Sequence, residues 1–138
     1  MSNRITELQK ICQDYNITAL YVFGSRAAEI VRALDDDSYS LAPSASDLDV
    51  GILSQSDFSV DTKVNLTLDL ENLFNATNVD LFVLQEVDAF LAANIIRGER
   101  VFTADSYFAD EYELFVLSRA GDLAELERER IEMILQES

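Results

Sequence analysis

Residues 21–26 read YVFGSR and residues 46–53 read SDLDVGIL. The first stretch is an apolar run that ends in a Gly-Ser pair, and the second opens with Asp47 and Asp49 before it turns apolar. Apolar runs of this length beside turn-forming residues predict two buried β-strands. Residues i and i+2 of a strand share a face, so the two carboxylates point the same way with their Cα atoms roughly 6.5 Å apart. Paired hard oxygen ligands suit Mg²⁺.

The Gly24-Ser25 pair lies between the first strand and a helix expected at residues 26–34. Glycine adopts backbone angles closed to other residues, and serine is a common helix cap. Free N–H groups and the positive end of the helix dipole would face an anion there, with the Ser25 hydroxyl as a further donor and Arg26 as a nearby positive charge. The turn therefore predicts a phosphate site, and its neighbouring carboxylates indicate nucleotide chemistry.

A third acidic residue, Asp80, opens a later apolar strand at residues 79–84. In this order, a Gly-Ser turn, an Asp-x-Asp pair and a lone strand aspartate resemble the motifs of the polymerase-β-type nucleotidyltransferase superfamily. The resemblance spans about residues 17–103. The small size of the chain narrows the resemblance to one group of this superfamily, the minimal nucleotidyltransferases, many of which resemble antitoxins paired with HEPN toxins.

The chain departs from the family pattern between its first two motifs. Residues 26–46 separate Ser25 from Asp47, which is 21 residues, about twice the usual family length. After the expected helix, residues 35–37 are three aspartates, which we interpret as a solvated charge cluster. Residues 38–46 contain Pro43 and four serines and predict a polar surface loop.

The resemblance implies an α/β fold with a small mixed β-sheet flanked by helices. It also implies transfer of AMP from ATP to an acceptor hydroxyl, namely a tyrosine of a HEPN-type toxin. The residues expected to be catalytic and to hold two Mg²⁺ ions are Asp47, Asp49 and Asp80. Those expected to bind the phosphates of ATP are Gly24, Ser25 and Arg26.

Composition excludes several kinds of active site. The chain has no histidine, which excludes Ser-His-Asp and Cys-His triads and His-ligated zinc or iron. Its single cysteine, Cys12, cannot form an intramolecular disulfide and suits a reducing compartment. Because Cys12 falls on the apolar face of the first expected helix, we predict an inert packed thiol. Chemistry must then come from carboxylates, hydroxyls and bound metal.

The formal net charge is −16, from 26 acidic and 10 basic residues. This charge would repel a phosphate backbone, so we expect no direct nucleic-acid partner. It favours a basic protein partner, although the same charge could serve solubility alone. We find no basic and apolar leader and no apolar run long enough to cross a bilayer, so we expect a cytoplasmic protein without membrane contact.

Hydrophobic periodicity predicts a single domain over residues 1–138 with alternating helices and strands. Asn3 is available to cap the first helix, Gly98 should close the fourth, and Gly121 could bend or split the last. The expected helices are 4–15, 26–34, 60–74, 88–97 and 106–136. The expected strands are 19–23, 47–53, 79–84 and a short edge strand at 99–103. Apolar contacts expected from the last helix are Phe108, Tyr112, Phe115, Val116, Leu123, Leu126, Ile134 and Leu135.

Residues 60–74 fit two patterns. Val64, Leu66, Leu68 and Leu70 alternate as in a strand, whereas Leu66 and Leu70 also belong to a helical repeat that continues to Phe74. We predict a helix, because it would let the strand at residues 79–84 lie parallel to its predecessor through a crossover connection.

Three functions remain open from the sequence. The first is the AMP-transferring enzyme described above. The second is a catalytically inactive acidic module that neutralises a basic toxin by direct contact. The third is a transferase for a small molecule such as an antibiotic, for which the chain is short. The presence of all three aspartates favours the enzyme, and either a homodimer or a hetero-oligomer is compatible with these functions.

Overall fold

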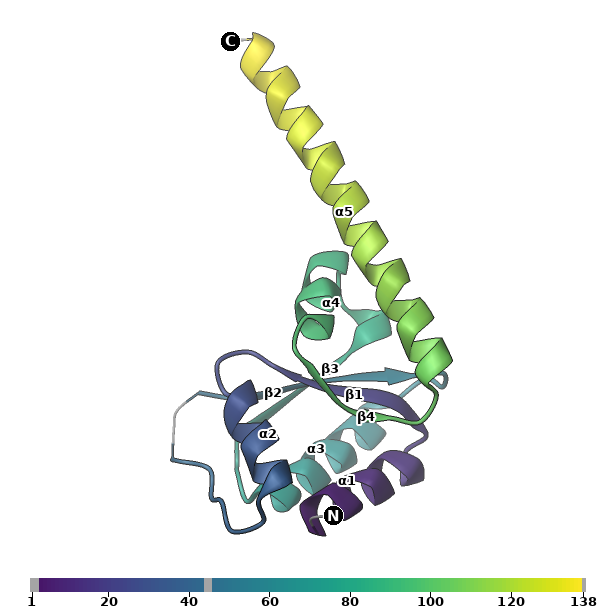
Figure 1. The fold of residues 1–138 in the computed structure, drawn as a ribbon. Helices are drawn as coiled ribbons and strands as arrows, with labels where there is room; N and C mark the ends of the chain where they lie inside the picture. Colours follow the sequence, from purple (N-terminus) through teal and green to yellow (C-terminus); the bar gives the residue numbers. More distant parts are fainter. Residues whose placement is uncertain (1–2, 44–45, 138) are drawn as a thin grey trace.

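The computed structural model describes residues 3–43 and 46–137. Helices and strands alternate along the chain as the hydrophobic pattern predicts (Figure 1). The helices are α1 (Asn3–Asp14), α2 (Ala27–Asp35), α3 (Val60–Phe74), the 3₁₀ turn η1 (Leu84–Glu86), α4 (Ala89–Ile96) and α5 (Ser106–Glu137). The strands are β1 (Ile17–Phe23), β2 (Leu48–Ser54), β3 (Val79–Val83) and β4 (Glu99–Thr103).

The four strands form one mixed sheet in the order β3-β2-β1-β4. β1 pairs antiparallel with both β2 and β4, and β2 pairs parallel with β3. The parallel pair is joined through α3, so both the helix at residues 60–74 and its crossover role are confirmed. Leu66, Leu70 and Phe74 are buried while Val64 and Leu68 are exposed, which is the helical repeat and not the alternating one.

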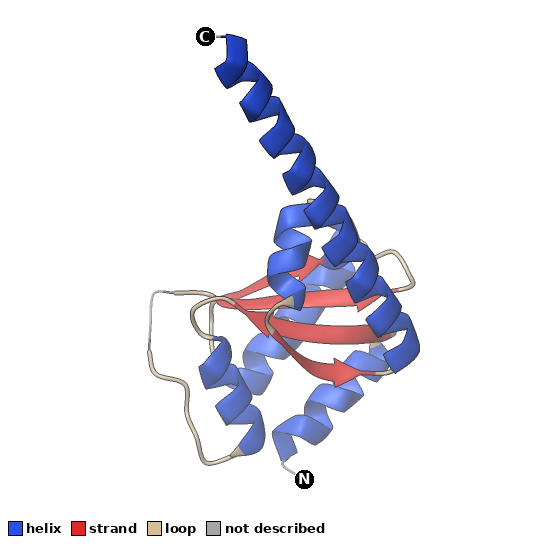
Figure 2. Cartoon of the chain, turned by 45° about the horizontal axis from the view of Figure 1, so that its top comes forward, coloured by secondary structure: helices blue, strands red, loops and turns tan. Residues whose placement is uncertain are grey.

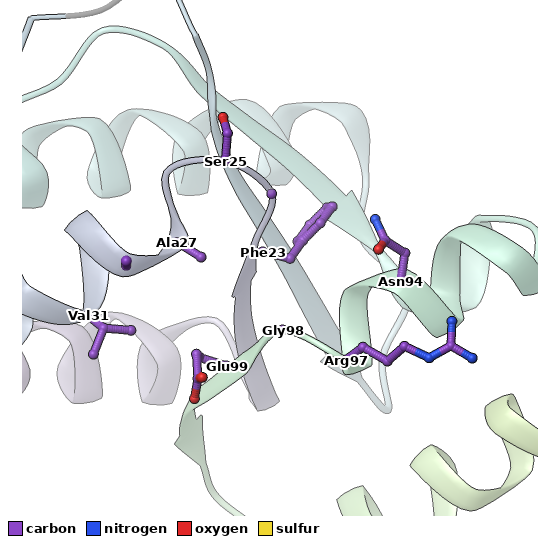
Figure 3. Close-up of a pocket in the computed structure, with 10 residues that line it drawn as sticks. Phe23, Ser25, Ala27, Val31, Asn94, Arg97, Gly98 and Glu99 are labelled. Atoms are coloured by element: carbon purple, nitrogen blue, oxygen red, sulfur yellow. The ribbon is translucent and has the colours of Figure 1, made fainter.

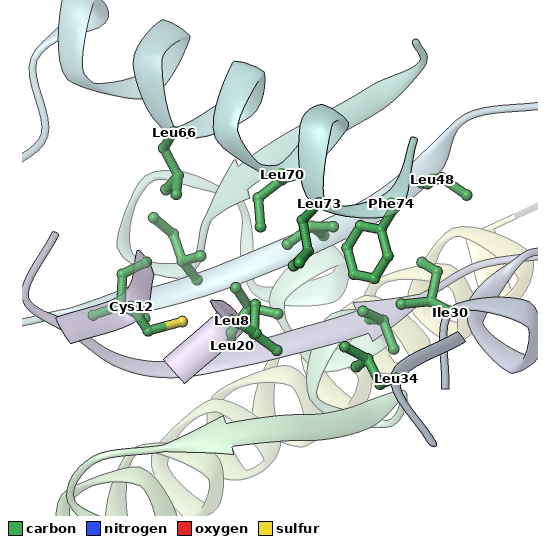
Figure 4. Packing of buried hydrophobic residues seen from close by; sticks show 14 of the residues in the cluster. Leu8, Cys12, Leu20, Ile30, Leu34, Leu48, Leu66, Leu70, Leu73 and Phe74 are labelled. Atoms are coloured by element: carbon green, nitrogen blue, oxygen red, sulfur yellow. The ribbon is translucent and has the colours of Figure 1, made fainter. Parts of the chain in front are cut away.

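Helices cover both faces of this sheet (Figure 2). α1, α2 and α3 pack on one face, where β1 and β2 contribute every second residue (Figure 4). The cluster includes Leu8, Leu20, Val22, Ile30, Leu48, Val50, Ile52 and Leu70. Cys12 is buried among them, and burial raises the pKa of its thiol to about 12, so the prediction of an inert packed thiol is confirmed.

α4 and the first half of α5 pack on the opposite face. The residues buried there are mainly Ala19, Tyr21, Leu53, Ala92, Ala93, Ile95, Ala109, Val116 and Ala120. At the start of α5, the Tyr21 hydroxyl donates to Glu113 at 2.7 Å and Arg100 donates to the same carboxylate at 2.7 Å. Strands β1 and β4 thus hold the base of α5 through one shared acceptor.

α5 differs from its prediction in two ways. It runs through Gly121 without a break, because a Cβ there would meet nothing within 4 Å and no packing forces a bend at that point. Its expected apolar contacts also hold only in the first half: Val116 is buried, and Phe108 and Tyr112 pack at the edge of the cluster. Phe115 is exposed on the outer side of the first half. Leu123, Leu126, Ile134 and Leu135 are exposed because the second half of α5 extends beyond the body that it would have to cover (Figure 1).

The start of α1 also differs from prediction. Asn3 is the first helical residue and not a cap. The exposed N–H groups of Asn3 and Arg4 instead donate to the two oxygens of Asp37, at 2.7 and 3.2 Å. Asp37 is therefore more than part of a solvated cluster, because it ties the segment after α2 to the first helix.

The loop predicted over residues 38–46 is irregular where described, and its residues 44–45 lie outside the described ranges.

None of the helices within the described ranges has the length and hydropathy that a membrane crossing requires.

Candidate functional site

Strand register brings the predicted carboxylates to one end of the sheet. Asp49 is paired with Asp80 across the parallel β2–β3 ladder, and with Phe23 across the antiparallel β1–β2 ladder. Neighbouring strands lie about 4.8 Å apart, so side chains in register on one face are close neighbours. Leu48 and Val50 point into the core beneath α1–α3, so Asp49 points to the face that carries α4.

Asp47 immediately precedes β2 and is exposed, as is Asp80, whereas Asp49 is half-buried. Burial, followed by the charges of Asp80 and Asp47, raises the pKa of the Asp49 carboxyl above its ordinary value. The charges of Asp80 and Asp47 therefore reach the Asp49 carboxyl.

These carboxylates do not form a finished coordination sphere. Within residues 3–43 and 46–137, no three acidic side chains lie close enough together to hold an ion as they stand. Like charges that only repel one another move apart to the extent that their backbones allow. The donors are hard oxygens on adjacent strands, and this set fits Mg²⁺ better than a soft or His-preferring metal.

Gly24 lies directly against Asp49. Its φ of +77° is in the region that favours glycine, and a Cβ at this position would lie 2.3 Å from the Asp49 Oδ2 atom. Both the turn conformation and the close approach therefore require glycine. The turn and the carboxylates, which lie more than 20 residues apart in the chain, form one continuous surface.

The serine of this turn is not a helix cap. The N-cap of α2 is Arg26, and no side chain caps this end of the helix. The turn is closed by the backbone instead, with the N–H of Ala27 donating to the Gly24 carbonyl at 3.3 Å. Ser25 is exposed, so its hydroxyl lies at the surface beside Gly24.

Arg26 has a different role from the one expected. Its side chain is buried, and its guanidinium donates to Glu29 at 2.7 Å, to the Ala42 carbonyl at 2.7 Å and to the Ser46 carbonyl at 3.2 Å. These acceptors satisfy the guanidinium within the protein and hold the chain just before Asp47. The structure therefore gives Arg26 a positioning role in place of a phosphate contact.

Two further arginines fasten the long segment between the motifs. Arg4 donates to the carbonyls of Ala33, Asp36 and Tyr39 at 3.0, 3.2 and 2.7 Å. The Arg32 guanidinium lies 4.4 Å from the centre of the Tyr39 ring. The extra length thus folds onto α1 and α2 and leaves the Gly24 turn beside Asp49.

A pocket of about 670 Å³ borders the Gly24-Ser25 turn (Figure 3). Its walls come from the turn, α2, the end of α4 and the start of β4, and include Asn94, Arg97 and Glu99. β4 brings them there, because Glu99 pairs with Val22 one residue before Phe23. Sequence reasoning missed Asn94 and Arg97, since neither belongs to a motif and only the sheet order places them near Gly24.

The crowding of charge around Asp49 predicts a specific effect on stability. A carboxyl whose pKa rises on folding destabilises the folded state as pH climbs above the ordinary value of about 3.9, and the cost is absent well below it. We therefore expect Asp49→Asn to raise the melting temperature at pH 7, and the gain to shrink toward pH 3, in calorimetric scans without metal. Asp57→Asn, an exposed aspartate away from the site, is the matched control. Equal gains for the two variants at pH 7 would contradict this electrostatic description.

Residues 6–107 match the family model described as Polymerase beta, Nucleotidyltransferase. No curated protein sequence matches the chain.

Solved structures share the fold along almost the whole chain. One is a variant of the toxin-antitoxin MntA-HpeT with two aspartate-to-glutamate substitutions (TM-score 0.70, 14% identity, 95% of this chain and 98% of that chain covered). Another is a toxin-antitoxin with AMP-PNP (TM-score 0.70, 15% identity, 97% of this chain and 99% of that chain covered). A third is a tri-AMPylated Shewanella oneidensis HEPN toxin in complex with MNT antitoxin (TM-score 0.66, 14% identity, 96% of this chain and 96% of that chain covered). The likeness extends to α5, and at these identities it establishes the fold alone. Because the family model spans most of the sequence, this chain belongs to the polymerase β nucleotidyltransferase family.

Proposed function

We propose that the chain is a Mg²⁺-dependent nucleotidyltransferase that moves AMP from ATP onto a tyrosine hydroxyl of a HEPN-type toxin. The observation that carries this proposal is the position of Asp49, which lies in register with Asp80 and against the Gly24 turn in a member of the nucleotidyltransferase family. Three hard-oxygen donors and a phosphate-binding turn then share one surface.

Each residue has a separate task in this proposal. Asp47, Asp49 and Asp80 would hold the two Mg²⁺ ions that the reaction is expected to use. Gly24 would let the polyphosphate approach the backbone, and the Ser25 hydroxyl would donate a hydrogen bond to it. Bound Mg²⁺ would supply positive charge against the charge that develops on the phosphoryl oxygens.

The reaction forms a bond between the acceptor oxygen and the α-phosphorus of ATP. The bond from that phosphorus to the oxygen bridging to the β-phosphate breaks, and pyrophosphate leaves with the electron pair. The acceptor hydroxyl loses its proton, and in this proposal the carboxylate of Asp80, which is exposed near the start of β3, would accept it. Arg26 acts on this reaction only by holding the chain before Asp47.

Arg97 would contact the leaving pyrophosphate. It is the only arginine or lysine in the wall of the 670 Å³ pocket beside Gly24-Ser25, and among the described residues it makes no ion pair. Gly24 and Ser25 themselves line this pocket, so phosphates held at the turn would border it. Glu99 in the same wall carries the opposite charge and would limit how far they reach.

The acceptor is proposed from two observations. Solved neighbours of the same fold include a HEPN toxin that carries AMP and a toxin-antitoxin with AMP-PNP. The net charge of −16 disfavours nucleic-acid substrates and suits a basic protein. We also propose that the reaction takes place in the cytoplasm, because a free, buried cysteine such as Cys12 suits a reducing compartment.

The competing proposal is an inactive acidic module that neutralises the toxin by contact. The variant Asp80→Asn separates the two, because it keeps the side-chain shape but removes a metal ligand and proton acceptor. We expect wild type to add the mass of AMP to a co-expressed HEPN partner, and Asp80→Asn to lower that transfer at least about 100-fold. Intact-mass spectrometry of the partner gives the result.

Asp57→Asn is the matched control and should transfer AMP as wild type does. If the partner stays unmodified, and wild type and Asp80→Asn neutralise it equally well, the binding module is the correct account.

A second experiment tests Arg97. A hydrogen-bonded charge contributes about 1.5–3 kcal/mol, so Arg97→Ala should weaken ATP binding about tenfold or more in calorimetry. AMP binding should change little, because AMP lacks the two phosphates that Arg97 would contact. Lys10→Ala removes the same charge from α1, away from this pocket. If Lys10→Ala weakens ATP binding as much as Arg97→Ala does, only long-range charge is acting and the assignment is wrong.

A further inference from the structure

The two halves of α5 have different surroundings. In the first half, Ala109, Val116 and Ala120 are buried against the body. From residue 121 to residue 136 no residue is buried, and this half extends past α4 into solvent (Figure 1). We call residues 122–136 the distal segment of α5.

The distal segment nevertheless carries an apolar face. Leu123 lies seven residues after the buried Val116, so it continues the same side of the helix. The exposed apolar residues of the segment are Leu123, Leu126, Ile131, Met133, Ile134 and Leu135. Most of the helical stability in proteins comes from packing such a face, and an isolated stretch of this length is marginal in water. Gly121 at its start lowers the helix propensity further.

Charge indicates what covers this face. A second copy of the chain would bring another net charge of −16 to the interface, which opposes self-association. Asp122 precedes Leu126 by four residues and Glu129 precedes Met133 by four, so each acid lies beside an apolar residue on the helix surface. Arg130 also lies four residues from Leu126 and from Ile134, but Arg128 and Arg130 are ion-paired with Glu125 and Glu127 on the helix itself. The segment has five acidic residues and two arginines, so its surplus charge is negative and fits an apolar surface edged with Lys and Arg.

We infer that the distal segment of α5 is the docking element for the protein that receives AMP, and that it binds an apolar, basic-edged surface of that protein. This inference rests on the proposed function for the identity of the acceptor. The base of α5 is held by Glu113 to Tyr21 and Arg100, and β4, which carries Arg100, begins at the pocket wall. The docking element is thus fixed to the same body as the active site. Contacts remote from the reacting atoms would select the acceptor without taking part in the chemistry.

The test measures, by calorimetry and in the absence of ATP, the binding of a purified HEPN-type protein of the kind proposed as the acceptor. Leu126→Glu should weaken binding on the order of 30-fold or more, as removal of a central apolar contact does. Leu68→Glu, which places the same charge at an exposed leucine of α3, is the matched control and should stay within about threefold of wild type. Leu126 is 61% exposed in the free chain, so its replacement should leave the fold and ATP binding intact.

A second variant, Asp122→Lys with Glu129→Lys, tests the charge. It should weaken binding and reduce the dependence of affinity on salt. The inference is overturned if Leu126→Glu and the double lysine variant both bind as wild type does. It is also overturned if the chain alone sediments as a dimer that Leu126→Glu dissociates, since a second copy then covers the face. Loss of binding without any AMP transfer by wild type would support the docking element and refute only the enzymatic proposal.

Discussion

Repulsion between carboxylates at one end of the sheet is the constraint around which this molecule is arranged. Asp49 and Asp80 are fixed opposite one another by the β2–β3 register, and Asp47 lies two residues away. The alternate residues of β2, Leu48 and Val50, are fully buried on the other face, so β2 cannot rotate or slip to relieve the charge. The core therefore holds together groups that destabilise the fold, which is typical of a site that a cation completes.

Several neighbouring residues determine the arrangement of the chain at the same end of the sheet. Gly24 admits the Asp49 side chain where any Cβ would collide with it. Arg26 holds the chain that leads into Asp47, and Arg4 and Arg32 fold the long inter-motif segment away. Three of the ten basic residues of a strongly acidic chain are thus used to position acidic ones. The result is a surface on which the Gly24 backbone, the Ser25 hydroxyl and the carboxylate of Asp49 lie close together.

The sequence predicts those features that depend on local pattern. Apolar alternation placed Asp49 and Asp80 on strands, and Asp47 only one residue before the point where β2 begins, and helical spacing identified residues 60–74, because a buried face must recur with the period of its element. Features that depend on contacts between distant residues could not be read in this way. Nothing local shows that Arg26 turns back to Ala42, that Asp37 binds the first turn of α1, or that β4 delivers Arg97 to the pocket. The apolar residues of the distal segment of α5 were misassigned to the core for a related reason. Their pattern shows that a partner is needed, but not whether the partner is the same chain.

Stabilisation by Mg²⁺ tests the central claim most directly. If the three carboxylates form one cation site beside a phosphate-binding turn, millimolar Mg²⁺ with ATP binds only the folded chain and raises its melting temperature. The double variant Asp47→Asn, Asp49→Asn lacks two of the donors and should show no such rise in the same calorimetric scan. A shift of equal size in wild type and the double variant, or no shift in either, would contradict the account.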